Sequence, residues 1–267
     1  MQTNSVLKKA NALIQNSSTS STAERKKMFC YQCEQTAESK GCTRYGVCGK
    51  SPEVATLQDL LIYALKGLSL YAIEGRKVGI NDSELNKFTC EAVFATLTNV
   101  NFDPERLEKF IRETVERRDA LKLRVQLAGG KTDFDGPAKL IPEKTIPGLV
   151  KQGEEVGIWS DLDIDADVHS LMWALTYGIK GIAAYADHAS ILGKEDDAVF
   201  RFIQEGLIAT LDKKKTLQEM IDLVMKAGQI NLRAMELLDE ANTRAYGNPT
   251  PTKVPLGTKI GKAILES

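Results

Sequence analysis

The sequence predicts an all-α fold in which a cysteine-rich loop precedes two related three-helix bundles. The C-terminal tail is expected to lead into an α/β domain that is missing from the chain. Apolar residues recur every three or four positions through most of the chain after residue 53. Residues that start and stop helices stand at the borders of these periodic stretches. One helical segment, beginning at residue 61, recurs at residue 175.

The composition limits the kind of protein this can be. A chain of 267 residues with 43% hydrophobic content can fill one large core or two ordinary ones. The net charge of −1 indicates no nucleic acid or anionic membrane as a partner. No apolar run approaches the roughly 20 residues that a membrane span needs. Five cysteines, four of them close together, are not the pattern of a disulfide scaffold.

Residues 1–27 differ in character from the rest. They are rich in serine and threonine, poor in acids and only partly amphipathic. We expect a disordered extension, or alternatively a transit-like peptide of the mitochondrial type. The expected location is cytoplasmic in the first case and an organelle matrix in the second.

Three helices are expected in the first half, after a loop over residues 28–52. Leucines at helical spacing mark the first, and an aspartate followed by proline at 103–104 starts the third. The glycine pair 129–130 ends it. The expected helices cover residues 54–78, 83–98 and 104–128.

A linker over 129–162 leads to the second half. Asp161, Asp163, Asp165 and Asp167 alternate at its end and are interpreted as solvated residues at a helix start. Thr216 and Glu219 form a capping box for the last helix. The expected helices are 164–191, 196–212 and 216–243, followed by a tail with a short strand at 263–265.

The two halves are related by an internal repeat. Six of twelve positions are identical between LIYALKGLSLYA (61–72) and LTYGIKGIAAYA (175–186). One of these positions is a glycine, Gly67 in the first segment and Gly181 in the second, which we interpret as a site of close helix packing. The matched tyrosines are expected in the core. The predicted divisions are 1–27, 28–52, 53–128, 129–162, 163–245 and 246–267.

The chemistry of the chain is concentrated in four cysteines, separated by two, eight and five residues: Cys30, Cys33, Cys42 and Cys48. Four soft thiolates in one loop can hold an iron–sulfur cluster or a structural zinc ion. Redox-active or disulfide-forming cysteines are a third interpretation. Zinc sites usually pair two Cys-x2-Cys units, so the wider second gap favours iron.

The rest of the loop suits an anionic group. Gly41 and Gly46 supply turns. Lys40, Arg44 and Lys50 place positive charge beside the thiolates, and free backbone N–H groups can bond to sulfur.

These residues carry a resemblance to a known family. MFCYQCEQTAESKGCTRYGVCGK followed by LQDLLIYALKGLSLYA resembles the N-terminal region of the hybrid cluster proteins, also called prismanes or hydroxylamine reductases. TLTNVNFD, YADHASILG and AYGNPTPTKV continue the match, which covers about residues 28–267. The cysteine spacing is similar to the family form with a [4Fe–4S] cluster, which implies that the four cysteines are iron ligands.

The resemblance implies reduction of hydroxylamine to ammonia, with nitric oxide as a further substrate. It also implies a ferredoxin-like or NAD(P)H-linked electron donor. The family's hybrid iron–sulfur–oxygen cluster has one histidine, two glutamates and four cysteines as ligands, in two following Rossmann-like domains. The chain as given is therefore expected to carry the electron relay and to be inactive alone. The alternative is a non-catalytic, zinc-stabilised helical scaffold or redox sensor.

The remaining candidate residues have plainer interpretations. Cys90 is expected to be a buried thiol. His188 is expected near a helix C-terminus, where it caps or meets the dipole, and His169 at the surface. The lysine run 213–215 is expected in a solvated turn.

Overall fold

The computed structural model describes residues 28–158 and 163–251. The predicted extension 1–27 and the predicted strand 263–265 lie outside these residues. Within the described ranges the regular structure is helical, apart from one isolated bridge between Cys30 and Cys42. The all-α prediction is confirmed. None of the helices in the described part of the chain is long and apolar enough to cross a bilayer.

The first half contains α2 (Pro52–Lys77), α3 (Ser83–Phe94) and α4 (Pro104–Leu127). The side chains of Ser51, Asp82 and Asp103 cap their N-termini by accepting backbone N–H bonds. The predicted start of each helix is thus correct to within two residues. Helix α3 ends earlier than predicted, because the chain turns at residues 95–100.

The segment expected as a linker contains two further elements, η2 (Gly136–Lys139) and α5 (Ile146–Gly153). Thr145 caps α5, and a proline occupies its first turn, where the missing N–H costs nothing. Gly153 brings α5 close to α2, since a Cβ atom there would lie 2.4 Å from the carbonyl oxygen of Thr56. Proline and glycine in so short a segment concealed this helix from sequence analysis.

The second half contains α6 (Ala166–Ile191), α7 (Asp197–Ala209) and α8 (Leu217–Tyr246). Asp165 caps α6, which confirms the interpretation of the acidic run for this residue. The capping box of Thr216 and Glu219 is present in full, with both side chains bonded to backbone N–H groups.

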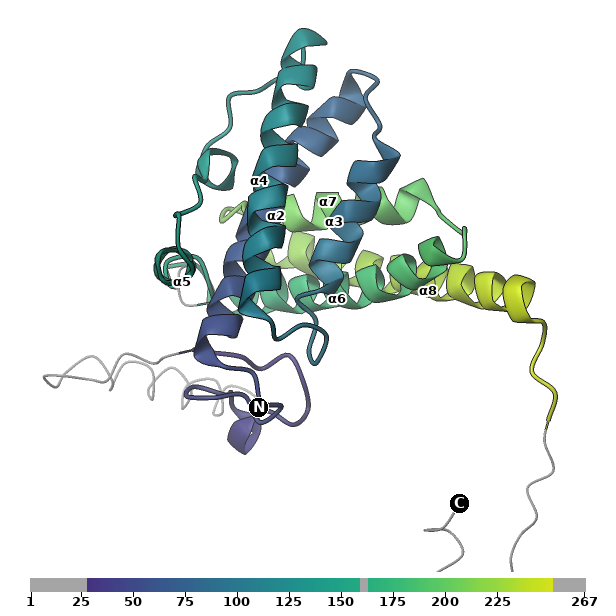
Figure 1. The fold of residues 1–267 in the computed structure, drawn as a ribbon, viewed down its shortest axis with the longest axis horizontal. Coiled ribbons are helices and arrows are strands. Elements are labelled where there is room, and N and C mark those ends of the chain that lie inside the picture. Colours follow the sequence, from purple (N-terminus) through teal and green to yellow (C-terminus); the bar gives the residue numbers. More distant parts are fainter. Residues whose placement is uncertain (1–27, 159–162, 252–267) are drawn as a thin grey trace, which may run out of the picture.

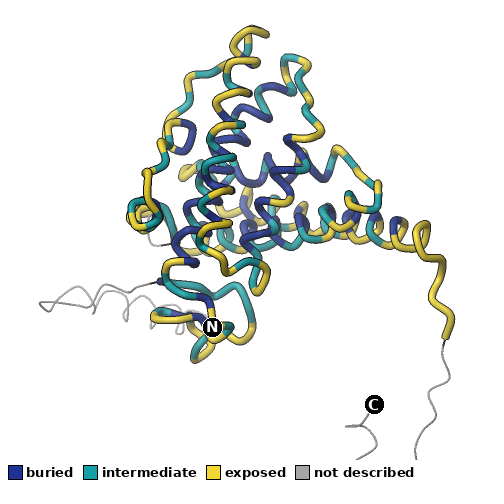
Figure 2. Tube along the Cα trace, in the orientation of Figure 1, coloured by how far each residue is buried: buried dark blue, intermediate teal, exposed yellow. Residues whose placement is uncertain are grey.

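The two halves interlock. Helices α2, α3 and α4 stand together, and α6 and α8 run across their lower part (Figure 1). Helix α2 packs along α4 as α6 packs along α8, but each middle helix packs mainly on the other half, α3 on α6 and α7 on α2. Each half therefore packs its middle helix on the other half, and one continuous apolar core runs through both halves. Figure 2 shows this buried interior in dark blue.

Repeat-related residues do not occupy equivalent environments. A Cβ atom on Gly67 would lie 2.3 Å from the carbonyl oxygen of Pro137, whereas one on Gly181 would meet no atom within 4 Å. The interpretation that both glycines permit close helix packing is therefore correct only for Gly67. Tyr71 is 1% exposed, but its counterpart Tyr185 is 37% exposed and is not a core residue.

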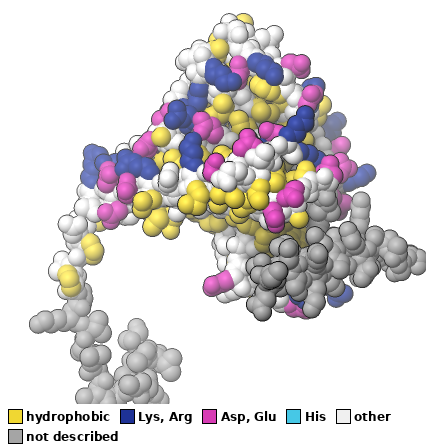
Figure 3. All heavy atoms as spheres, turned by 180° about the vertical axis from the view of Figure 1, so that it is seen from behind, with side chains coloured by type: hydrophobic (Ala, Val, Ile, Leu, Met, Phe, Trp, Pro, Cys, Tyr) yellow, Lys and Arg dark blue, Asp and Glu magenta, His cyan; other side chains and the backbone are white. Residues whose placement is uncertain are grey.

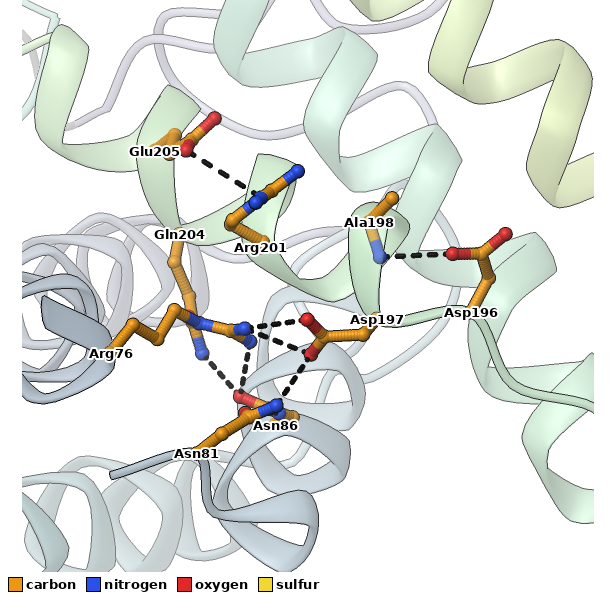
Figure 4. Close-up of polar contacts among 9 residues, drawn as sticks. All are labelled: Arg76, Asn81, Asn86, Asp196, Asp197, Ala198, Arg201, Gln204 and Glu205. Atoms are coloured by element: carbon orange, nitrogen blue, oxygen red, sulfur yellow. Dashed lines mark hydrogen bonds and ion pairs between the residues drawn. The ribbon is translucent and has the colours of Figure 1, made fainter. Parts of the chain in front are cut away.

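A polar network fastens the halves together (Figure 4). Arg76 at the end of α2 binds Asp197 of α7 at 2.7 Å and the Asn86 side chain at 3.3 Å. Gln204 of α7 donates to Asn86 at 2.8 Å. Because Asn86 lies on α3, the network joins the first helix of one half to both middle helices.

Helix α8 has a stripe of apolar side chains that are exposed to solvent. Seen from behind, hydrophobic side chains follow the lower part of the molecule (Figure 3). The exposed apolar residues of α8 include Leu217, Ile221, Met225, Leu232 and Met235.

The cysteine loop as candidate functional site

Cys30 and Cys42 lie opposite each other on two antiparallel strands of backbone. Cys30 N–H donates to Cys42 O at 3.1 Å, and Cys42 N–H donates to Cys30 O at 2.8 Å. Such a doubly bonded pair holds the two residues side by side. The hydroxyl of Thr36 also donates to Cys30 O at 3.0 Å. The bridge therefore brings the first and third cysteines together across an eleven-residue separation in sequence.

Two turns close the loop. In the first, Glu38 and Ser39 both have φ of 54°, and Gly41 has φ of 151°. A Cβ on Gly41 would lie 2.4 Å from the Phe29 ring, so glycine is required there. In the second, Gly46 N–H donates to Lys50 O at 2.8 Å. Both predicted turn glycines are confirmed.

The four thiols are all outside disulfides, with Cys42 buried and the other three partly exposed. Burial alone would raise the pKa of Cys42, but hydrogen bonds from backbone N–H groups of Ala37 and Val47 act against it. The Thr36 hydroxyl and Lys50 add to this, so the pKa of Cys42 lies below its ordinary value. The loop thus stabilises a thiolate at this position.

The loop rests on the start of α2 and on α6. Met28, Cys42 and Ala55 form a small apolar cluster of their own. The Tyr31 ring meets the Tyr177 ring of α6 edge-on, with centroids 5.4 Å apart. These contacts fix the loop to helices from both halves of the chain.

The floor beneath the loop is polar and buried. Lys50 Nζ donates to Gln58 Oε1 at 2.6 Å, and Gln58 in turn donates to Asn101 O at 3.0 Å. Lys180 Nζ of α6 donates to Thr96 O at 3.2 Å. Lys50 is therefore held by Gln58 of α2, and Lys180 of α6 is held by the turn between α3 and α4.

Two buried groups beneath the loop, Asp59 of α2 and Lys180 of α6, have perturbed pKa values. Burial raises the pKa of Asp59 to about 6, against the opposing pull of Lys180, Lys50 and Lys66. Burial, assisted by the charge of Lys50 and opposed by Asp59 and Cys30, lowers the pKa of Lys180 to about 8. A small cavity separates these groups from Cys30. Gln32 also lines this cavity, and its side-chain Oε1 is buried without a hydrogen-bond partner in the structure.

No three side chains of His, Cys, Asp or Glu converge closely enough to hold one metal ion within residues 28–158 and 163–251. Four free thiols in one loop, one of them favoured as a thiolate, are a donor set of the kind that an iron–sulfur cluster uses.

A sequence model described as the Prismane/CO dehydrogenase family matches residues 28–266. The chain belongs to the Prismane/CO dehydrogenase family. Membership of this family implies iron–sulfur binding in general terms.

Curated relatives of the chain bear the name hydroxylamine reductase. The chain is 61% identical over 241 residues to the one from Syntrophobacter fumaroxidans, 53% identical over 242 residues to the one from Methanocella arvoryzae, and 50% identical over 243 residues to the one from Solidesulfovibrio magneticus. Each match covers 90% of this chain but only 44% or 45% of the relative. The chain therefore spans less than half the length of these prismane-family proteins.

Cys90, His169 and His188 belong to helices α3 and α6 and not to the cysteine loop. Cys90 is buried in α3, where its thiol donates to Ala183 O at 3.2 Å and burial raises its pKa well above the ordinary value. His169 is partly buried, with Nε2 3.0 Å from Ile158 O. His188 lies in the last turn of α6, as predicted, with its ring against Phe94.

Sequence analysis missed the floor of the site. The sequence predicts positive charge at Lys50 but indicates no role for Asp59 or Lys180. A signal was present, since Asp59 interrupts the leucines of α2 and Lys180 stands between buried Ile179 and Ile182. A charged residue at a core position of a prismane-family helix is the pattern that would have found them.

Proposed function

We propose that Cys30, Cys33, Cys42 and Cys48 are the iron ligands of a [4Fe–4S] cluster, and that this chain is the electron-relay region of a hydroxylamine reductase. The observation that carries the proposal is the presence of four free thiols in one loop, whose first and third cysteines are paired through their backbones, in a chain of the prismane family. A bound [4Fe–4S] cluster supplies one-electron transfer.

The protein's own groups prepare the site. Backbone N–H groups of Ala37 and Val47 point at the Cys42 sulfur and favour its anionic form. On its inner side the loop is held by the edge-on contact between the Tyr31 ring and the Tyr177 ring of α6. The outer side exposes Tyr45 and other residues of the second turn, where an electron donor can approach.

The activity we propose for the whole protein is reduction of hydroxylamine to ammonia and water, which consumes two electrons and two protons. Nitric oxide is a second small nitrogen-oxide substrate in this proposal. The names of the relatives support it. The electrons come from a ferredoxin-like or NAD(P)H-linked donor, and a hybrid iron–sulfur–oxygen cluster is assigned to the full-length protein only.

Metal analysis of protein purified without oxygen tests the ligand assignment. We expect about four irons and four sulfides per chain, a brown colour and an electron paramagnetic resonance signal on reduction. Replacement of Cys42 by serine should abolish all of these. The matched control is Cys90→Ser, because Cys90 is the fifth cysteine and a serine hydroxyl can keep the hydrogen bond to Ala183 O.

A colourless protein with one zinc ion per chain would contradict the proposal and favour a zinc-stabilised scaffold. Full iron content in the Cys42→Ser variant would remove Cys42 from the ligand set.

A further inference from the structure

The floor of the cysteine loop contains an imbalance of buried charge. Lys50 and Lys180 are 1% and 2% exposed, and both line the cavity beside Cys30. One carboxylate lines it with them, that of Asp59. Burial of an ammonium group is costly unless an anion or strong acceptors replace the lost water. In this cavity one carboxylate therefore faces two ammonium groups.

The hydrogen bonds of the two lysines do not correct the imbalance. Lys50 Nζ donates to the amide oxygen of Gln58, and Lys180 Nζ donates to the backbone oxygen of Thr96. Both acceptors are neutral. They fix the position of each ammonium group but leave the positive charge in place.

The loop side of the cavity is where the missing anion belongs. Cys30 borders the cavity, and its thiolate attracts Lys180, while Lys50 attracts the thiolate of Cys42. An iron–sulfur cluster together with its four thiolate ligands carries net negative charge, and the total becomes more negative when the cluster accepts an electron. The buried cations and this anion are complementary.

We propose that Lys180, assisted by Lys50, is the countercharge that raises the reduction potential of the cluster held by the loop. The inference rests on the proposed function, since it needs a cluster on the four cysteines. A fixed cation in a low-dielectric site favours the more negative, reduced form. Asp59 opposes the lysines and lowers the potential. The neighbouring Lys66 of α2 attracts Asp59 and acts with the lysines.

The test is a redox titration of the cluster-loaded protein, prepared without oxygen and followed by its electron paramagnetic resonance signal. At the wild-type midpoint potential, Lys180→Met should lower the ratio of reduced to oxidised cluster about tenfold, equivalent to about 59 mV for one electron. Lys180→Arg keeps the charge and should restore the ratio. Asp59→Asn should shift the ratio in the opposite direction.

Opposite shifts from Lys180→Met and Asp59→Asn distinguish an electrostatic role from a structural one, because a loosened loop would not reverse sign with charge. Lys226→Met is the control, since it removes an exposed cation of α8 that water and salt already screen. If Lys180→Met fails to bind iron, Asp59→Asn decides alone: a raised potential supports the proposal and an unchanged one overturns it.

The proposal is overturned if Lys180→Met binds the full complement of iron at the wild-type potential, or if both variants shift it in the same direction. Wild-type protein without iron is a separate outcome, which overturns the proposed function itself.

Discussion

Arg76 of α2 donates two hydrogen bonds, of 2.9 and 2.7 Å, to the carboxylate of Asp197 in α7. The same guanidinium reaches Asn86 of α3 at 3.3 Å and Gln204 of α7 at 3.4 Å. Arginine suits this position because its planar fork can satisfy several acceptors at once. One side chain therefore holds together three helices from both halves of the repeat.

Replacement of Arg76 by methionine should lower the free energy of unfolding by about 2 kcal/mol, because it leaves Asn86 and Gln204 without their charged donor. The loss is modest because Asp197 is half exposed, so water already screens its pair with Arg76. Urea denaturation of the two proteins measures the difference. Arg201→Met is the matched control: its 3.8 Å pair with Glu205 is exposed and should contribute less than about 0.5 kcal/mol.

Asp196 should give the protein part of its sensitivity to acid. The hydrogen bond from Arg233 holds the pKa of Asp196 below its ordinary value of 3.8, against the effect of burial. Its stabilising contribution is therefore complete above about pH 4 and is lost as the pH falls through the lower folded value. We expect wild type to be more stable than Asp196→Asn at pH 5–7, with the difference shrinking at pH 3.

Urea unfolding at each pH measures this difference, and the acid sensitivity of the cysteine loop cancels because both proteins contain it. In an Arg233→Met background the substitution of Asp196 should have little effect. A difference that persists at pH 3 would show that the ionised Asp196 carboxylate is not its source.

Replacement of the two repeat glycines by alanine should change the stability of the protein in opposite directions. Gly67→Ala forces a Cβ to within 2.3 Å of the Pro137 oxygen and should destabilise the protein by about 1–3 kcal/mol. Gly181→Ala meets no atom within 4 Å and should stabilise α6 by about 0.5–1 kcal/mol. Thermal denaturation monitored by circular dichroism measures both. Equal losses would mean that the two sites are packed alike.

Cys90 should resist alkylation in the folded protein. Burial raises its pKa well above the ordinary value, so at pH 8 little thiolate is present, and thiolate is the reactive form. After removal of metal with a chelator, iodoacetamide should label the partly exposed Cys30, Cys33 and Cys48 but label Cys90 only in denaturant. Mass spectrometry of peptides measures each site. Rapid native labelling of Cys90 would show that α3 opens readily.

Local chemistry explains what the sequence predicted well. The Asp103–Pro104 start and the Thr216–Glu219 capping box depend on neighbouring residues alone, and both are present in the structure. The turn glycines of the cysteine loop belong to the same class. Helix α5 was missed because its first turn contains residues that more often end helices.

Residues whose role depends on distant packing could not be predicted in this way. Periodicity places Lys180 on the buried face of α6 but does not say that the face turns toward Cys30. Gly67 and Gly181 likewise occupy equivalent positions in the repeat, so the sequence does not show that η2 packs against Gly67 and not against Gly181. The four cysteines are close in sequence, and their cluster assignment stays a prediction that metal analysis must test.

The exchanged packing of α3 and α7 has a practical consequence for anyone who divides this chain. A fragment that ends between α4 and α6 would keep α3 but lose the α6 surface that α3 covers, and would uncover the side of α2 on which α7 lies. Each fragment would expose core side chains to water and would be prone to pair with a second copy through the vacated surfaces. Expression boundaries therefore belong outside Pro52–Tyr246.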